Sequence, residues 1–435
     1  MGISARAIRH ERHRVSFTQE IPDLLVAHSD IVFSGSGRRQ VRVLRVVGCG
    51  ESSVPKTGFR CAGRKGMKAL LIGGTGPTGP HVVRGLLARG FVVTILHSGR
   101  HETPEIPPEV EHVHADAYDV EAIGTALGRR NFDLCISTYG RLRRNAEFFA
   151  GRVGRFLSVG GFPAYRGYMN AGILDPPGLP VPTREDAPLV QRPEEDEKGF
   201  RIARTEEAVF DAQPEATHLR YPWVYGPRQP APREWIIVRR ILDRRPHIIL
   251  ADGGLTLSHF GYAENLAHAV LLAVDQPERA AGQIFNCGDQ TVPTLRQVVE
   301  TIADAMGHRW EIIPMPWEIA GPAKPLVGQP WTTHRVISLT KIESVLGYRD
   351  VVAPADGLIR TARWLAENRP EPGGPEERVL EDPFDYDAED RLISGYRKAL
   401  ASVPEPIWSE GRSPGWGMAY SGPGGRGRSR TTFEP

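Results

Sequence analysis

The residues with the clearest chemical potential are the glycines of Gly73-Gly74-Thr75-Gly76-Pro77-Thr78-Gly79. Glycines at this spacing let the backbone turn sharply and approach a bound phosphate closely. A helix that begins at the end of such a turn adds backbone N–H donors and the positive end of its dipole. We therefore expect a cradle for the pyrophosphate of a dinucleotide, formed by Gly73, Thr75, Gly76, Pro77, Thr78 and Gly79. The alternative is a glycine turn of an α/β protein that binds no ligand.

The segments on either side of this stretch are those that such a cradle requires. The apolar run 68–72 predicts a buried parallel strand. Residues 81–90 are apolar at helical spacing and end in a glycine, which predicts a helix, and 91–96 predicts a second strand. A strand, a glycine turn, a helix and a strand within about 30 residues are typical of a dinucleotide-binding unit.

The alternation of strands and helices continues along the chain. It predicts further strands at 112–116, 132–137 and 155–161, a helix at 195–210 and another strand from residue 218. Together these elements indicate an α/β fold with a doubly wound parallel sheet. We expect one dinucleotide-binding domain over residues 67–400, with a smaller C-terminal substrate region mainly at 222–400. Residues 1–66 are predicted to be a disordered basic extension, and 401–435 a disordered tail.

Composition excludes several classes of protein. Of the 435 residues 40% are hydrophobic and 24% charged, which is typical of a soluble globular protein. A net charge of +2 gives no reason to expect nucleic acid as a main partner, although residues 1–66 carry twelve basic and five acidic residues. No apolar run reaches the ~18 residues of a membrane span. The four cysteines lack metal-ligand spacing, so we expect a cytoplasmic protein without disulfides or a zinc site.

Four places in the chain resemble the extended short-chain dehydrogenase/reductase group, which includes NAD-dependent epimerases and dehydratases of nucleotide sugars. They are the spacing of Gly73, Gly76 and Gly79, the acid Asp116 after the third strand, the segment 219–228 and the segment 259–269. The resemblance covers residues 67–400. It implies a Rossmann-type fold, a nicotinamide cofactor, a small-molecule substrate and contact between Asp116 and the adenine. Members of the group often form homodimers, so we expect a homodimer here.

The residues after the second strand bear on the choice of cofactor. An acid that accepts hydrogen bonds from the ribose hydroxyls is usual in NAD sites, but the first acid here is Glu102. Arg100 and Ser98 can instead bind a ribose phosphate, since a guanidinium pairs with phosphate through two hydrogen bonds. The sequence therefore favours NADP, with NAD as the alternative. In a purely structural interpretation, Arg100 is a solvated loop residue that binds no phosphate.

The catalytic residues of the resembled group are replaced. Its tyrosine and the lysine four residues later correspond here to Phe200 and Arg204. Phenylalanine has no proton to exchange, and arginine stays protonated in proteins. Arg204 can still hold the ribose hydroxyls. The resemblance thus predicts the fold and the cofactor, and places ordinary epimerase or dehydrogenase chemistry in question.

Other residues are candidates for the missing roles. Tyr165 and Tyr168 follow the fifth strand, and either phenol can exchange a proton if a neighbouring charge lowers its pKa. Loop tyrosines also serve packing or substrate binding. Arg228 and Tyr262 stand where the resembled group contacts substrate. The histidines at 259, 268 and 334 show no convergent spacing, so no metal site is expected.

Two functions follow from these observations. The first is an NAD(P)-dependent enzyme that transfers hydride to or from a nucleotide sugar or another carbonyl or hydroxyl compound. The second is a catalytically silent protein that binds NADP as a sensor or regulator. The pair Phe200 and Arg204 favours the second function, and the substrate-side segments favour the first.

Overall fold

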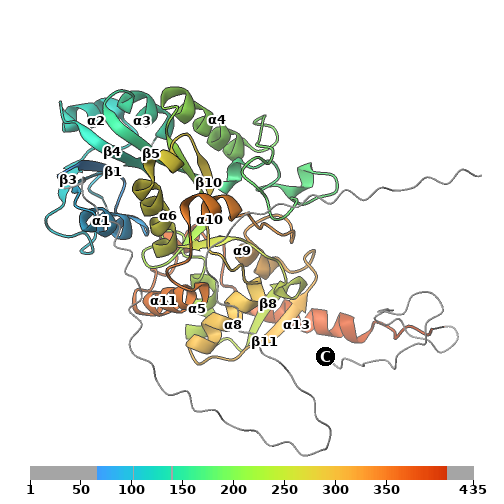
Figure 1. Cartoon of the computed structure of the whole chain (residues 1–435). Helices are drawn as coiled ribbons and strands as arrows, with labels where there is room; N and C mark the ends of the chain where they lie inside the picture. Colours follow the sequence, from blue (N-terminus) through green and yellow to red (C-terminus); the bar gives the residue numbers. More distant parts are fainter. Residues whose placement is uncertain (1–65, 101, 139–140, 409–435) are drawn as a thin grey trace, which may run out of the picture. The chain divides into compact units, whose positions relative to one another are not determined.

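A seven-stranded sheet, with every neighbouring pair of strands parallel, organises the fold (Figure 1). The structure, a computed structural model, describes residues 66–100, 102–138 and 141–408. The strands lie in the order β10-β6-β5-β4-β1-β2-β3. Their bounds are β1 (Lys68–Ile72), β2 (Val92–His97), β3 (Glu111–His114), β4 (Phe132–Ser137), β5 (Val153–Gly161), β6 (Thr217–Tyr221) and β10 (Ile284–Asn286). The strand order reverses between β1 and β4, where doubly wound sheets bind their ligands.

Helices cover both faces of the sheet (Figure 1), and successive residues of the central strands pack against different helix layers. Leu71 and Ile95 pack with α1 (Gly79–Ala88), α6 (Ala263–Asp275) and α10 (Thr340–Leu346). Leu70 and Leu96 pack with α2 (Val120–Leu127), α3 (Leu142–Phe149) and α4 (Glu197–Ala212). Both faces of the sheet are therefore buried, which explains why the central strands β1 and β2 are mostly apolar. The predicted doubly wound fold is confirmed.

A second hydrophobic core lies in the C-terminal part of the chain. It is formed by α5 (Trp235–Leu242), β8 (His247–Ala251), α8 (Leu295–Ala305), β11 (Glu311–Met315), α11 (Pro354–Glu367) and α13 (Tyr386–Ala401). The buried guanidinium of Arg240 donates to Asp382 at 2.8 Å and to Glu389 at 2.5 Å, and so fixes α13 against α5. The shorter elements are β7 (Trp223–Tyr225), β9 (Phe260–Tyr262), α7 (Pro277–Ala280), α9 (Lys324–Val327) and α12 (Pro375–Arg378).

The predicted elements agree closely with the observed ones. β1 and β4 have the predicted bounds, and α1 and α4 differ from prediction by about two residues at their ends. The predicted extension and tail lie outside the described residues, except for Gly66 and residues 401–408. Cys135 and Cys287 are buried free thiols. None of the described helices is both long and apolar enough to cross a membrane.

The glycine turn joins β1 to α1 in a conformation that needs glycine at defined positions. Gly73 and Gly74 have φ angles of 102° and 91°, which other residues rarely adopt. A Cβ atom on Gly79 would lie 2.0 Å from the carbonyl oxygen of Gly74, whereas one on Gly76 would meet nothing within 4 Å. Gly79 is thus required by packing of the chain against itself, and Gly76 borders open space.

We expect Gly79→Ala to lower the free energy of unfolding by about 1–3 kcal/mol, because its methyl group must push backbone atoms apart. Gly76→Ala is the matched control and should change this free energy by less than about 0.5 kcal/mol. Urea unfolding of the two variants and the wild type measures both values. Equal stabilities of the two variants would contradict the proposed role of Gly79.

Candidate functional site

The predicted cofactor residues other than Arg204 lie at the carboxyl ends of β1, β2 and β3. The Gly73 amide donates to the carbonyl of Leu96 at 2.9 Å, which ties the glycine turn to the end of β2. Thr78, the residue before α1, makes no side-chain cap to the helix. In the first turn the Gly79 amide donates to the Gly76 carbonyl at 3.0 Å and Pro80 has no N–H, so the His81 amide remains available to a ligand. Ser98 and Arg100 have exposed side chains on the loop that follows β2.

Asp116 lies on the next loop, after β3. Its carboxylate accepts a hydrogen bond from the Tyr118 amide at 2.9 Å, and it is exposed. The structure thus brings Asp116 to the same edge of the sheet as the glycine turn and the loop of Ser98 and Arg100. This is the edge at which parallel α/β sheets bind ligands.

A cavity of about 1100 Å³ lies at the carboxyl ends of the next three strands, β4, β5 and β6. It is lined by Thr138 after β4, by Gly160 and Gly161 at the end of β5, and by Tyr221 at the end of β6. The Thr138 amide donates to the carbonyl of Ile72 at 3.1 Å, so the cavity begins beside the end of β1. Its opposite wall comes from Phe260, Arg335 and neighbouring residues of the C-terminal part.

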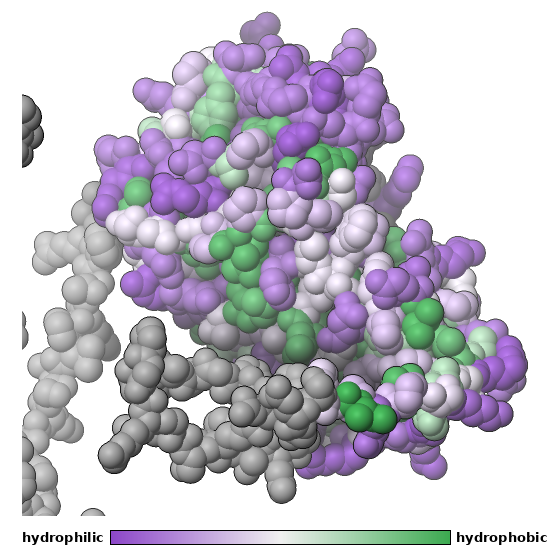
Figure 2. All heavy atoms as spheres, turned by 90° about the vertical axis from the view of Figure 1, so that its right-hand side faces the viewer, coloured by the Kyte–Doolittle hydropathy of each residue, from purple (hydrophilic) through white to green (hydrophobic). Residues whose placement is uncertain are grey.

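One face of the molecule carries apolar surface at mid-height. Figure 2 shows hydrophobic and weakly polar residues at mid-height on one face, between strongly hydrophilic residues above and below. The same height in Figure 1 is that of α6, α9 and α10. Trp223, whose side chain is 37% exposed, lines the cavity together with Met169. An apolar wall with a few polar groups is typical of a small-molecule site.

The charged residues that line the cavity are all cationic. Its described lining contains eight arginine and lysine side chains and no carboxylate: Arg141, Arg143, Arg144, Lys198, Arg201, Arg204, Arg233 and Arg335. Arg201 and Arg204 contact Glu197 and Glu207 on the exposed side of α4. Low-dielectric walls strengthen the field of such charges, so the cavity attracts anions.

Arg233 and Arg335 are the two buried members of this set, each about 5% exposed. Both donate to the carbonyl of Val327, at 3.2 Å and 3.3 Å, and neither forms an ion pair among the described residues. Burial, followed by the neighbouring charge of Arg335, lowers the pKa of Arg233 to about 10. The Nε atom of Arg335 is buried without a hydrogen-bond partner. Two adjacent guanidiniums without a counter-ion are the strongest indication of an anion subsite.

The adjacent carboxyl of Glu234 does not supply that counter-ion. Burial raises its pKa to about 7, and its Oε2 atom has no hydrogen-bond partner. It is not part of the cavity lining. The guanidinium of Arg233 is instead stacked over two rings, 4.6 Å from the centroid of Trp223 and 5.3 Å from that of Phe260.

Phe200 and Arg204 are both on α4, and both line the cavity opposite Gly160 and Gly161. The helix therefore presents to the cavity the two residues that replace the tyrosine and the lysine of the resembled group. Phenylalanine has no hydroxyl in the place of the tyrosine. Arg204 keeps a positive charge there, with a hydrogen-bond geometry different from that of lysine.

The two candidate tyrosines have different surroundings. Tyr165 is fully buried and outside the cavity lining, and its hydroxyl donates to Asn286 at 2.6 Å and accepts from Arg220 at 2.7 Å. Burial raises the pKa of Tyr165 to about 12, the opposite of the expected lowering. Tyr168 lines the cavity, with the guanidinium of Arg335 stacked 4.9 Å from its ring centroid. Of the two candidate tyrosines, Tyr168 lines the cavity and Tyr165 does not.

The predicted substrate residues Arg228 and Tyr262 do not reach the cavity. Arg228 donates to Glu105 at 3.2 Å, which neutralises its charge away from the lining. Tyr262 is 4% exposed and its ring packs 5.3 Å from that of Tyr225. Sequence reasoning missed Arg233 and Arg335 instead, because they lie about a hundred residues apart in irregular segments and share no spacing pattern.

The comparisons with known proteins agree with this geometry. Residues 204–288 match the family model described as "NAD dependent epimerase/dehydratase family". A UDP-glucose 4-epimerase from Thermotoga maritima, solved with UDP-glucose, superposes with a TM-score of 0.55 at 21% identity, over 69% of this chain and 99% of that chain. The Bordetella bronchiseptica enzyme WbmG in complex with NAD gives a TM-score of 0.56 at 15% identity, over 72% and 96%. These structures share the fold.

Sequence relatives match shorter parts of the chain. The uncharacterised Sinorhizobium fredii protein y4nL is 28% identical over 189 residues, which cover 39% of this chain and 52% of that protein. A UDP-D-apiose/UDP-D-xylose synthase of Arabidopsis thaliana is 37% identical over 84 residues, or 19% of this chain and 22% of that protein. The chain therefore spans about half or less of the curated relatives it matches. The predicted resemblance to NAD-dependent epimerases and dehydratases is confirmed.

A buried histidine beside the cavity predicts how stability depends on pH. His259 accepts from the Ile337 amide at Nδ1 (3.2 Å), and its Nε2 lies 2.8 Å from the Asp289 carbonyl oxygen, so the native ring is neutral. Burial lowers the pKa of His259 from 6.5 to about 4. Between these values the unfolded chain binds a proton that the native state does not, so the free energy of unfolding falls as the pH falls.

We expect His259→Gln to reduce the slope of the free energy of unfolding against pH, between pH ~6.5 and ~4, by the equivalent of about one bound proton. Urea unfolding at several pH values gives the slope for the wild type and the variant. His334→Gln, which changes an exposed histidine, serves as the control. An unchanged slope in His259→Gln would show that His259 is not held neutral in the native state.

Proposed function

We propose that this chain, which resembles the NAD-dependent epimerases and dehydratases, is an NADP-dependent enzyme that acts on a nucleotide sugar or a related carbonyl or hydroxyl compound. The observation that carries the proposal is the cavity beside the glycine turn, whose charged lining residues are all cationic. A bound nicotinamide would supply the hydride acceptor or donor. The chain's own residues must bind, orient and exchange protons with the substrate.

The cofactor end of the proposed site is the glycine turn with the loops that follow β2 and β3. The open space at Gly76 fits the close approach of a pyrophosphate, and the first turn of α1 offers the His81 amide and the positive end of the helix dipole to it. Ser98 and Arg100 would hold the ribose phosphate, which favours NADP over NAD. Asp116 would contact the adenine, and Arg204 would hold the ribose next to the nicotinamide.

The substrate end is the part of the cavity at Arg233 and Arg335. Two buried guanidiniums without a carboxylate partner suit a diphosphate, which offers several acceptor oxygens to their N–H groups. The diphosphate of a nucleotide sugar is such a group. It would also relieve the unfavourable burial of the two positive charges.

Tyr168 is the proposed acid–base residue, since it is the one of the two candidate tyrosines that lines the cavity. Its hydroxyl is the proton-exchanging group that the role requires, and the guanidinium of Arg335 is stacked on its ring. The alternative is a silent NADP sensor, which the replacement of the usual pair by Phe200 and Arg204 favours. A cytoplasmic location and a homodimer remain predictions.

The cofactor proposal predicts binding of NADPH and NADP with clear preference over NADH and NAD in calorimetric titrations. Arg100→Ala should weaken the phosphorylated forms by roughly 10- to 100-fold, the value of one charge-assisted contact, and leave NAD unaffected. Gly76→Ala should weaken all four, because its methyl group enters the space of the pyrophosphate. A protein that binds none of them would have the glycine turn as a feature of its fold alone, and the enzyme proposal would be abandoned.

The chemical proposal predicts that two variants separate binding from turnover. Arg335→Gln should weaken binding of UDP about tenfold or more, because it removes a buried charged donor. Tyr168→Phe should keep UDP affinity and lower the rate at which UDP-sugars reduce NADP by about 10²-fold. Isothermal titration and the absorbance of the reduced nicotinamide measure the two effects.

Tyr165→Phe is the matched control for the tyrosine variant. It removes hydrogen bonds to Asn286 and Arg220, so it should lower stability and leave the rate per folded molecule unchanged. A Tyr168→Phe variant with full turnover would rule out the proposed acid–base residue. Binding of NADP and UDP without reduction by any UDP-sugar would favour the sensor.

A further inference from the structure

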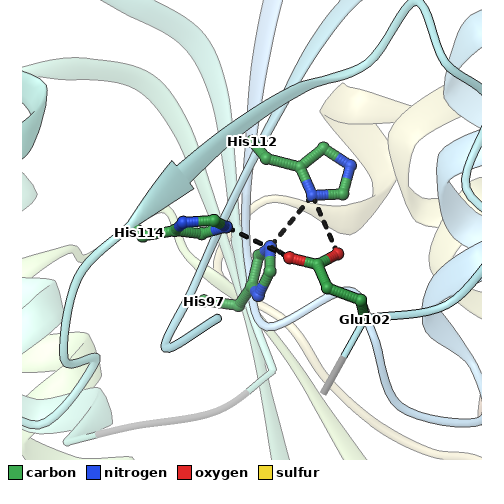
Figure 3. A group of neighbouring side chains, drawn as sticks. All are labelled: His97, Glu102, His112 and His114. Carbon is green, nitrogen blue, oxygen red and sulfur yellow. Dashed lines mark hydrogen bonds and ion pairs between the residues drawn. The ribbon is translucent and has the colours of Figure 1, made fainter. Parts of the chain in front are cut away.

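Three histidines and a glutamate converge at the carboxyl ends of β2 and β3. Figure 3 shows His97, His112, His114 and Glu102 pointing toward one another from two strands and the loop after β2. Their ligand-type atoms all lie within 4.8 Å of one another. The sequence predicted no metal site from the histidines at 259, 268 and 334, and the four residues that converge here are different ones.

The sheet explains why the histidines meet. His112 and His114 are two residues apart on β3, so their side chains leave the same face of the strand. The parallel register pairs His97 of β2 with His114 of β3, which places His97 on that face as well. β3 is the edge strand of the sheet, and the site is open to solvent on the side of Glu102 and His114, whose side chains are 50% and 57% exposed.

Four of the distances between these groups are close to those around a zinc ion. His97 Nε2 lies 3.1 Å from His112 Nδ1 and 3.6 Å from Glu102 Oε1. Glu102 Oε2 lies 3.2 Å from His112 Nδ1, and Oε1 lies 3.1 Å from His114 Nε2. Zinc bonds of about 2.0–2.1 Å in a tetrahedron separate the ligand atoms by about 3.4 Å. The three rings are nearly perpendicular to one another, as separate ligands of one ion can be.

With neutral rings, no placement of the imidazole protons lets every nitrogen and oxygen of this group form a hydrogen bond. The Gly99 amide donates to Nδ1 of His97 at 3.2 Å, so the proton of His97 is on Nε2. If His112 Nδ1 accepts the hydrogen bond from His97, then Nδ1 has no proton to donate to Glu102 Oε2, and two acceptor atoms face each other. If His112 Nδ1 instead carries a proton and donates it to Glu102, then the N–H groups of His97 and His112 face each other at 3.1 Å. A cation between the four groups accepts lone pairs from all of them.

We propose that His97, Glu102, His112 and His114 form a binding site for Zn²⁺. Imidazole nitrogens with one carboxylate suit zinc, whereas Ca²⁺ and Mg²⁺ prefer oxygen ligands alone. Four protein ligands fill a tetrahedron, so the ion has a structural role and leaves no position for an activated water. Coordination moves the proton of His97 to Nδ1, and the hydrogen bond from Gly99 is exchanged for a metal–nitrogen bond. The ion would join the loop that carries Ser98 and Arg100 to the edge of the sheet.

The test is a zinc titration of the tag-free full chain, stripped of metal, in competition with a chromogenic chelator. We expect one tight equivalent in the wild type. His112→Ala and His114→Ala should each weaken it by at least ~10- to 100-fold, since even changes outside the ligand shell have that effect. Glu102→Gln keeps the size of an exposed side chain and should weaken it as well. Co²⁺ in place of zinc should give the visible absorption of a tetrahedral ion in the wild type only.

His247→Ala is the matched control. His247 lies 3.1 Å from Glu311 and belongs to no group of three or more metal-type ligands in the described chain. Its removal should leave the zinc equivalent intact. Zinc affinity unchanged in Glu102→Gln and His114→Ala, or no tight equivalent in the wild type, would overturn the proposal. Thermal melts without metal show whether each variant is folded, and zinc binding is measured without turnover, so a failed activity assay leaves its outcome unaffected.

Discussion

The candidate site depends on one buried ion pair, between Arg220 of β6 and Glu206 of α4. The guanidinium donates to both carboxylate oxygens, at 2.8 Å and 2.6 Å, and both side chains are under 6% exposed. Its remaining donors reach the Tyr165 hydroxyl at 2.7 Å and the Glu185 carbonyl at 3.0 Å. This pair fixes the helix that carries Phe200 and Arg204 against the sheet, together with the loops after β5. Removal of one partner would leave the other charge buried, which is far more costly than losing an exposed pair.

The same network separates the two tyrosines that the sequence could not distinguish. Tyr165 fills a hydrogen-bonding position between Arg220 and Asn286, so its hydroxyl is committed to the fold. Tyr168 comes three residues later, beyond the network, and faces the cavity. The buried arginines of the cavity differ from Arg220 in having no acidic partner in the part of the chain that the structure describes. Arg233 and Arg335 are buried without the acid that Arg220 has, and charges kept at such a cost are typical of binding sites.

The main sheet could be predicted from the sequence because each of its signals is local. A strand buried on both faces is an apolar run, and the glycines of the turn are required by a neighbour only five residues away, as Gly79 is by Gly74. These signals also placed Phe200 and Arg204 on the helix that lines the cavity. They did not indicate that Arg228 and Tyr262 lie outside the cavity lining, where Arg228 pairs with Glu105 and the ring of Tyr262 packs near that of Tyr225.

The residues that sequence reasoning missed are paired through space. His112 and His114 have the spacing of one strand face and could have been recognised as two potential ligands. His97 joins them only because β2 and β3 are parallel and in a register that sets it opposite His114, and the sequence of neither strand contains that register. Arg233 and Arg335 likewise meet at the carbonyl of Val327, which no local pattern marks. A site whose residues lie in one segment can be recognised from the sequence. A site whose residues come from several segments can be recognised only when the fold that brings them together is known.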